Sequence, residues 1–382
     1  MHLVSQLTTH LVPKAGIPSS GGRGKAPPVI SVVAMAGLSS FVREAFGDRV
    51  LRRANQAIML NIESIEHLDC FIPQATATAF LDAIEREGRE PNLGLLFAPE
   101  VSMPSFGHWG RYVLAVGTLR AAIVRAASTL DYHCSGDRIA LSVASGIARV
   151  RYVSAARGRP GYNHLATGIA AALLSLLEPF VPPGWRPSMI ELDIPRPPSP
   201  TPFEDAFSCP VAFGASEVAI HFAANLLDVP VGRHADPCMI TLGDVVRNRL
   251  SPATLDSFLD VTVAQIWAQV LAGAASVEST ALALGTSVRS LQRVLNREGT
   301  DFRSLTNMIR IQRARELLAG TGASVTEISG ALGYSAPAHF ARTFRKATGV
   351  APQEFRRQVW AAGSREMFST AIPLARSSAH DR

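Results

Sequence analysis

Two short segments in the last third of the chain carry hydrogen-bonding side chains at matching positions, about 48 residues apart. Arginine recurs in both, beside Gln and Ser in the first segment and beside His and Lys in the second. Arg bonds in pairs to O6 and N7 of guanine, Gln bonds in pairs to adenine, and Arg or Lys also binds phosphate. These residue types therefore predict a nucleic-acid-binding surface. The candidate contact residues are Ser287, Arg289, Ser290, Gln292, Arg293, Arg297, Ser335, His339, Arg342, Arg345 and Lys346.

Each segment has the pattern of two short helices separated by a turn, over residues 280–299 and 325–349. Gly285 and Gly333 stand where the first helix of each pair must end, in a left-handed backbone that glycine adopts at low cost. A helix-turn-helix unit of this kind places its second helix in the major groove of DNA. Two units in tandem predict two contacts with one face of a duplex.

The second helix of each unit has a predicted start and a predicted apolar face. Ser287 and Ser335 are placed to accept an N–H bond at the helix start, and Pro337 falls in the first turn, where its missing N–H costs nothing. Ala281 is small enough for the two helices of the first unit to cross closely, whereas its counterpart Ser329 is bulkier and polar. The apolar stripes consist of Val288, Leu291 and Leu295 in the first unit and of Phe340 and Phe344 in the second.

Positive charge is concentrated in the same region. Residues 263–360 include twelve basic and six acidic side chains, a net charge of +6, which equals the formal charge of the whole chain. A polyanionic partner explains this concentration, and the alternative is a pair of helical hairpins whose arginines are merely solvated. We expect base contacts from Arg289, Gln292, Arg293, His339 and Arg342, and phosphate contacts from Arg297, Arg345, Lys346, Arg356 and Arg357.

Residues 302–319 connect the two units and contain no Gly or Pro. Ile311, Ala314 and Leu318 share one face, which predicts a single helix of about 17 residues, roughly 25 Å long. Two helices that enter successive major grooves are about 34 Å apart. The length of this helix plus half the length of each helix-turn-helix unit comes to a similar distance.

The combined pattern resembles the DNA-binding domain of AraC/XylS-type bacterial transcription regulators. The resemblance covers residues 259–360 and rests on GTSVRSLQRVLNREGTDF, RIQRARELL and VTEISGALGYSAPAHFARTFRKATGVAPQEFR. It implies seven helices, with recognition helices at Val288–Arg297 and about Pro337–Thr348, and it favours an activator and a dimer. The chain has Tyr334 where the family usually has Phe, and one additional residue before Phe340.

The preceding 250 residues have a mixed α/β pattern. Ser39 or Ser40 is expected to cap a helix that runs through Phe46 and Leu51. Further helices are predicted at residues 74–86, 112–130 and 163–177, a β-hairpin at 138–143 and 147–154, and strands at 189–194, 211–213 and 217–222. The fold class is thus a mixed α/β N-terminal domain followed by an all-α domain with two helix-turn-helix motifs and a linker helix.

The N-terminal region resembles the effector domain of one subgroup of the same family, labelled arabinose-binding-like, to which ornithine-utilisation regulators belong. The resemblance rests on residues 203–214 (FEDAFSCPVAFG) and 106–119. It implies ligand sensing, dimerisation or both, and does not imply a sugar. Aromatic and imidazole groups near Gly/Pro loops are candidate effector contacts, with packed or solvated side chains as the alternative for each. These candidates are His108, Trp109, Tyr132, His133, His164, Trp185 and His221.

The expected domain organisation follows from these patterns. It comprises a disordered tail at residues 1–28, an effector-sensing and dimerisation domain at 29–255, an AraC-type DNA-binding domain at 256–362 with units at about 276–298 and 325–348, and a flexible tail at 363–382.

Catalysis is not indicated. The four cysteines lie far apart without a C-x-x-C pair, so neither zinc nor a disulfide framework is predicted. Motifs of nucleophilic enzymes and phosphate-binding glycine loops are also absent from the sequence. We expect no catalytic residue, metal or cofactor. The alternatives to a ligand-sensing regulator are an architectural DNA binder without an effector and, less favoured, an enzyme domain fused to the DNA reader.

The apolar runs at residues 29–38 and 169–177 are too short to span a bilayer, and the segment before the first is long for a signal peptide. We therefore expect no membrane contact and a cytoplasmic location. The expected partners are double-stranded promoter or operator DNA, an unidentified small-molecule effector, RNA polymerase and a second copy of the chain.

Overall fold

The computed structural model describes residues 26–68, 70–230, 257–321 and 323–359. It divides into two compact units, Met1–Leu305 and Thr306–Arg382. The tail expected at residues 363–382 lies outside the described residues. So do residues 1–25 of the tail expected at 1–28 and residues 231–255 of the expected effector domain. The domain boundaries drawn from the sequence stay predictions.

A five-stranded sheet forms one side of the N-terminal region, with the strand order β3-β4-β7-β5-β6. The strands are β3 (Arg138–Ala144), β4 (Ile147–Val153), β5 (Met189–Leu192), β6 (Val211–Phe213) and β7 (Val218–Ala223). Neighbours run antiparallel except β5 and β6, which are parallel. Ser145 and Gly146 join β3 to β4 with positive φ angles of 51° and 77°, which a two-residue hairpin turn favours. The hairpin and strands predicted from the sequence are confirmed.

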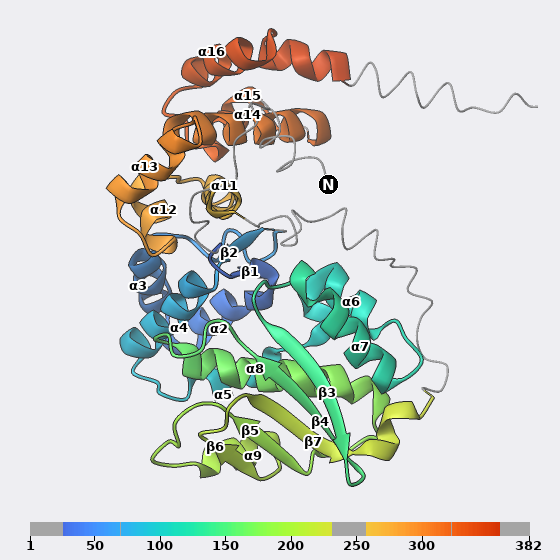
Figure 1. The fold of residues 1–382 in the computed structure, drawn as a ribbon. Helices are drawn as coiled ribbons and strands as arrows, with labels where there is room; N and C mark the ends of the chain where they lie inside the picture. The colour runs from blue at the N-terminus through green and yellow to red at the C-terminus, as the bar shows by residue number, and fades with distance from the viewer. Residues whose placement is uncertain (1–25, 69, 231–256, 322, 360–382) are drawn as a thin grey trace, which may run out of the picture. The chain divides into compact units, whose positions relative to one another are not determined.

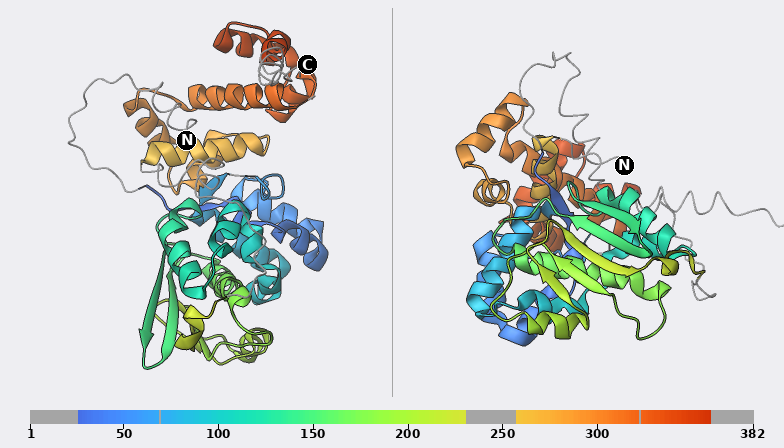
Figure 2. Two further views of the ribbon diagram at one scale, coloured as in Figure 1. Left: turned by 90° about the vertical axis from the view of Figure 1, so that its right-hand side faces the viewer. Right: turned by 60° about the horizontal axis from the view of Figure 1, so that its bottom comes forward.

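Helices cover one face of this sheet. Helix α8 (Tyr162–Leu177) contacts β5 and β7 on one side and α4 (Gln74–Gly88) and α5 (Leu93–Phe97) on the other (Figure 1). Two further views show the sheet at one side of this region, the blue and cyan helices at the opposite side and α8 between them (Figure 2). Helix α7 (Leu119–Thr129) packs against β3 and α6 (Gly107–Leu114) against α7. The shorter helices are η1 (Val32–Met35), η2 (Ala98–Glu100), η3 (Met103–Phe106), η4 (Leu130–Tyr132), η5 (Glu178–Phe180), α9 (Thr201–Phe207) and η6 (Ala224–Asp228).

The first predicted helix is two helices, and its predicted cap is wrong. Helices α2 (Leu38–Phe46) and α3 (Asp48–Ile58) are separated by Gly47, whose φ of 86° cannot continue a helix. Ser39 lies inside α2, and its backbone N–H donates to the Glu66 carboxylate at 3.2 Å. A carboxylate distant in sequence therefore accepts from a backbone N–H at the helix start, where the sequence predicts a local serine cap.

The helix predicted at residues 112–130 is also divided. Helix α6 ends at Leu114, and α7 begins after Thr118, whose hydroxyl accepts from the backbone N–H of Ala121 at 3.3 Å. Thr118 is therefore an N-cap inside the span that the sequence predicts to be one continuous helix. The helices predicted at 74–86 and 163–177 are confirmed as α4 and α8.

A two-stranded ribbon of β1 (Val29–Ser31) and β2 (Phe71–Pro73) was not predicted. Strand β2 contacts α11 (Phe258–Leu271), a helix in which every residue from Val261 to Val270 is buried. A helix that is buried on all sides needs packing partners on all sides. Helix α12 (Val277–Ala283) also packs against α11.

The remaining helices of the C-terminal region are α13 (Val288–Arg297), α14 (Phe302–Gly320), α15 (Val325–Ala331), α16 (Pro337–Thr348) and a helix at residues 352–359. Together with α11 and α12 they are the seven helices that the family resemblance implies, so the predicted fold class is confirmed. Among the described residues no single helix has the length and hydropathy of a membrane span. One bent pair, Met103–Leu114 and Leu119–Tyr132, reaches that length and hydropathy only when combined across a 116° bend.

Candidate functional site

The first helix-turn-helix unit consists of α12 and α13. Gly285 has a φ of 62°, and the Ser287 hydroxyl accepts from the backbone N–H of Ser290 at 3.1 Å. Leu291 and Leu295 are completely buried, so they fix which face of α13 points outward. The predicted turn, cap and apolar stripe are all present in this unit.

The outer face of α13 carries the predicted DNA-contacting side chains. Arg289, Gln292, Arg293 and Arg297 are all exposed, and none of them forms an ion pair with a described residue. Their hydrogen-bonding groups face solvent from a helix whose position is fixed by its cap and by buried leucines. That arrangement can present donors to a nucleic acid without first breaking an ion pair with a described residue.

Helix α15 opens the second unit and has a reciprocal cap. The Ser324 hydroxyl accepts from the backbone N–H of Glu327 at 3.2 Å, and the Glu327 carboxylate accepts from the backbone N–H of Ser324 at 2.7 Å. The hydrogen bonds that the Ser324 backbone N–H and hydroxyl donate to the Glu327 carboxylate lower the pKa of Glu327 because they favour its charged form. Gly333 then ends the helix with a φ of 72°.

The predicted cap of the second recognition helix is wrong. Helix α16 begins at Pro337, its N-cap residue is Ala336, and no side chain caps it. The additional residue in this unit moves the helix start one position beyond Ser335, so the serine is exposed and one residue too early. Pro337 does occupy the first turn as predicted, where its missing N–H leaves no donor unsatisfied.

Helix α16 keeps the predicted division into two faces. Phe340 and Phe344 are completely buried, whereas His339, Arg342, Arg345 and Lys346 are exposed. Tyr334 replaces the Phe that the family resemblance leads us to expect, and its ring packs against Phe340 at 5.4 Å between centroids. Burial raises the pKa of the Tyr334 hydroxyl. The aromatic contact is therefore kept with tyrosine at this position.

The two units differ where their helices cross. Ala281 in α12 is 2% exposed, and its counterpart Ser329 in α15 is 1% exposed. The Ser329 hydroxyl has no hydrogen-bond partner among the described residues. The poorer fit expected for a polar residue at this position is therefore visible as an unpaired buried hydroxyl.

Arg356 and Arg357 have different roles. The Arg356 guanidinium donates to the backbone carbonyls of Leu318 and Ala323, near the end of α14. A cation at a helix C-terminus satisfies carbonyls that lack intrahelical partners. Arg356 thus has a structural contact that the sequence did not predict, while Arg357 is exposed and pairs with Glu354.

Helix α14 is the single connecting helix that the sequence predicts. It has 19 residues, about 28 Å at 1.5 Å per residue. Asp301 caps it by accepting from the backbone N–H of Ser304 at 2.9 Å, and this bond lowers the pKa of Asp301. The spacing of the two recognition helices stays a prediction.

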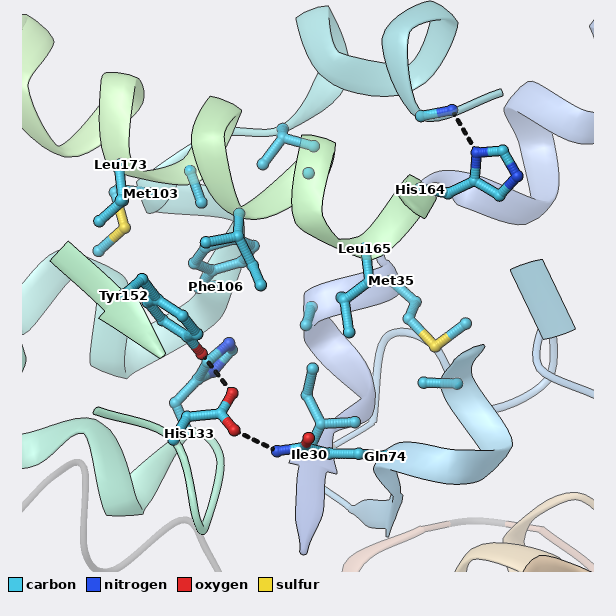
Figure 3. Close-up of a pocket in the computed structure, with 18 of the residues that line it drawn as sticks. Ile30, Met35, Gln74, Met103, Phe106, His133, Tyr152, His164, Leu165 and Leu173 are labelled. Atoms are coloured by element: carbon cyan, nitrogen blue, oxygen red, sulfur yellow. Dashed lines mark hydrogen bonds between the residues drawn. The ribbon is translucent and has the colours of Figure 1, made fainter. Parts of the chain in front are cut away.

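A cavity of about 120 Å³ lies in the N-terminal region between α8 and helices α4, α5 and α7 (Figure 3). Helix α8 contributes residues at a helical spacing of three or four, which place them on one face. Gly168 and Ala172 are the small members of this face, and they leave room that larger side chains would fill. The α8 residues that line the cavity are His164, Leu165, Gly168, Ile169, Ala172, Leu173 and Leu176.

One end of the cavity is polar. Asp137 accepts hydrogen bonds from the Gln74 amide at 2.9 Å, the Tyr152 hydroxyl at 2.6 Å and the backbone N–H of Ala155 at 2.7 Å. Figure 3 shows the first two of these bonds. Burial raises the pKa of Tyr152 well above its usual range, and the nearby thiol of Cys134 and carboxylate of Asp137 raise it further. Tyr152 therefore stays protonated and donates.

Three of the seven predicted effector contacts line this cavity: Trp109, His133 and His164. The rings of Trp109 and His133 stack with centroids 4.5 Å apart and an angle of 8°. Nδ1 of His164 accepts from the backbone N–H of Gly94 at 3.2 Å, and Nε2 lies 2.7 Å from the Glu85 carboxylate. A Cβ atom on Gly94 would stand 2.8 Å from Cα of His164, so this approach requires glycine.

The other four candidates lie elsewhere. Trp185 lines a separate groove with Pro182 and Arg186, and His221 is 3.0 Å from Glu191 in an ionic cluster on the sheet. Burial opposes ionisation of Glu191, but the hydrogen bonds and positive charges of Arg149 and His221 together outweigh it and lower the pKa of this carboxyl. His108 and Tyr132 are half-buried and are not part of the cavity wall.

Four residues that shape the cavity were not predicted as effector contacts: Gln74, Asp137, Tyr152 and Gly168. They come from α4, the loop before β3, β4 and α8, and no local spacing joins them. The one usable signal was Gly168 in the middle of an apolar helix. A glycine there lowers the stability of the helix, so its presence indicates open space or close packing beside it.

Two regions of the chain match known families. Residues 47–231 match the arabinose-binding domain of AraC transcription regulators, N-terminal, and residues 280–358 match a helix-turn-helix domain. The chain is 25% identical over 269 residues to the Ornithine utilization regulator of Pseudomonas aeruginosa, with 70% of this chain and 79% of that protein covered.

Two further relatives match over shorter stretches. The uncharacterized HTH-type transcriptional regulator Rv1395 of Mycobacterium tuberculosis is 30% identical over 162 residues, which cover 39% of this chain and 43% of that protein. The transcriptional activator NphR of Rhodococcus sp is 33% identical over 89 residues, which cover 23% and 27%. The aligned part of the chain thus spans less than half the length of these two relatives. All three relatives are named as regulators.

Proposed function

Because the chain belongs to the AraC type of transcription regulators, we propose that it binds double-stranded DNA at specific sequences through α13 and α16 and thereby regulates transcription. The observation that supports this most is the outward row of Arg and Gln on α13, a capped helix held by two completely buried leucines. Helix α16 repeats the arrangement over a pair of buried phenylalanines.

The exposed side chains divide by their place on each helix. Residues near the start of a recognition helix reach base edges, and residues farther along reach the phosphates beside the groove. We assign Arg289, Gln292, Arg293, His339 and Arg342 to bases, and Arg297, Arg345 and Lys346 to phosphates. A paired contact with a base contributes about 1–3 kcal/mol of discrimination against the wrong base.

We further propose that the N-terminal domain senses a small molecule, that the chain acts as an activator and dimer in the cytoplasm, and that it contacts RNA polymerase. The largely apolar cavity supports the sensing role, and the name of NphR supports activation. An architectural DNA binder without an effector is the second candidate. A ligand that changes the affinity for the selected DNA would exclude it.

Site selection from a randomised duplex library, performed with the full chain, tests the assignment. Arg293→Ala should relax the preference at one base position and keep the rest of the motif. Lys346→Ala should weaken binding to all sequences alike and reduce the slope of log K against log salt by about 0.9. Arg196→Ala is the matched control, because Arg196 is an exposed arginine of the N-terminal region.

An unchanged motif with Arg293→Ala would remove this residue from base recognition. A sequence-selective loss with Lys346→Ala would contradict its phosphate role.

A further inference from the structure

The polar end of the cavity contains an unused hydrogen-bond acceptor. The amide nitrogen of Gln74 donates to the backbone carbonyl of Ser135 at 3.1 Å and to the Asp137 carboxylate at 2.9 Å. Both partners only accept, so this orientation of the amide is fixed. Gln74 is 1% exposed, and its Oε1 has no donor among the described residues. A buried amide oxygen without a donor is unfavourable, so the site is stabilised by any ligand that supplies one.

The size of the cavity limits the ligand. A cavity of about 150 Å³ in another protein is known to hold benzene, and this one is about 120 Å³. The space is therefore suited to roughly one ring or its aliphatic equivalent. Met35 and Met103 line the wall, and their flexible thioethers adapt to the shape of an occupant.

The charges around the cavity select a neutral ligand. Asp137 is 7% exposed, and its carboxylate is held by three donors from the protein. A ligand anion placed beside this carboxylate would be repelled. A ligand cation would lose its hydration among apolar walls and find Asp137 already paired, so its desolvation would be poorly compensated.

We propose that this cavity binds a small, uncharged, largely apolar molecule of about one ring that carries one hydroxyl or N–H group, which donates to Oε1 of Gln74. The proposal builds on the proposed function, since the ligand would be the effector of the regulator. Binding itself does not require DNA, so the two can fail separately.

Calorimetric titration of the full chain with phenol and with toluene tests the hydrogen bond, because the two probes differ by one hydroxyl in place of a methyl group. We expect phenol to bind at least about tenfold more tightly than toluene. Benzylamine and benzoate test the charge, and both should bind more weakly than phenol. Equal affinity for phenol and toluene, tighter binding of either charged probe, or no binding of any probe would overturn the proposal.

Gly168→Leu tests the location. Gly168 lines the cavity, and a Cβ atom built there meets nothing within 4 Å, so the leucine would occupy the cavity without disturbing the helix. Affinity for phenol should fall at least about tenfold, while the thermal unfolding midpoint does not decrease. Asn163→Leu, on the exposed surface of α8, is the matched control and should bind phenol as the unmodified chain does.

Unchanged phenol binding by Gly168→Leu would place the ligand elsewhere and refute the proposal. DNA binding measured on the same preparations separates this result from a failure of the proposed function. If the chain binds phenol in the cavity but binds no specific DNA sequence, the proposed ligand site stands and the proposed function as a transcription regulator is refuted.

Discussion

Ser329→Ala should stabilise the second helix-turn-helix unit. Ser329 is 1% exposed, and its hydroxyl has no partner among the described residues. Burial of an unpaired hydroxyl costs about 1–3 kcal/mol in proteins. Alanine removes that cost, leaves no large void and has the higher helix propensity, by a few tenths of a kcal/mol. We expect a gain of about 1–2 kcal/mol.

The chain provides its own matched control. Ala281 occupies the equivalent position in the first unit and is 2% exposed. Ala281→Ser would bury a hydroxyl where the native chain has a methyl group. It should therefore destabilise the first unit by a similar amount and leave the second unchanged.

Hydrogen exchange followed by mass spectrometry is the appropriate assay, because it reports the stability of each helix separately, whereas a global unfolding signal combines the two compact parts of the chain. In Ser329→Ala, amides of α15 and α16 should exchange about 5 to 30 times more slowly than in the native chain. Ala281→Ser should accelerate exchange in α12 and α13. Exchange in α15 that is unchanged or faster with Ser329→Ala would show that the hydroxyl is satisfied in solution, and the reasoning would be wrong.

Three further predictions follow from local structure. Ser287→Ala should destabilise α13 by about 1 kcal/mol because it removes a cap, whereas Ser335→Ala should not destabilise α16. Hydrogen exchange in α13 and α16 measures the two effects, and an equal loss of stability in both helices would contradict the observed start of α16. Gly168→Ala should raise the free energy of unfolding by up to about 1 kcal/mol, since the helix gains a better residue in open space, and a lower thermal midpoint would refute this. Burial raises the pKa of the Cys134 thiol well above its usual range, so this thiol should resist alkylation at pH 8 until the protein unfolds; labelling of the native protein there, identified by mass spectrometry, would contradict its burial.

The helix-turn-helix units were predictable because their signals are local. A glycine, a capping serine and an apolar stripe lie within about twenty residues of each other, and they fixed the elements and the outward face of each helix. The second unit shows the limit of this reasoning. One additional residue shifted the start of α16, and Ser335 lost the cap that the aligned Ser287 makes.

The N-terminal domain was predictable in its elements but not in its cavity. Alternating residues identified the hairpin, and the helices at residues 74–86 and 163–177 were predicted and are present as α4 and α8. Gln74 and Asp137 are 63 positions apart, and their hydrogen bond depends on the packing of separate elements. The sequence-based candidates were imidazole and aromatic residues near Gly/Pro loops, and three of these seven residues line the cavity.

The most direct test of the central claim is a methylation-protection footprint of the full chain on its selected DNA site, at a concentration where one monomer is bound. Binding through both α13 and α16 predicts two protected guanine patches in the major groove, about one helical turn apart on one face. Arg293→Ala and Arg342→Ala should each abolish protection in a different patch. A single patch, or protection that both variants leave intact, would contradict recognition of DNA by the two helices.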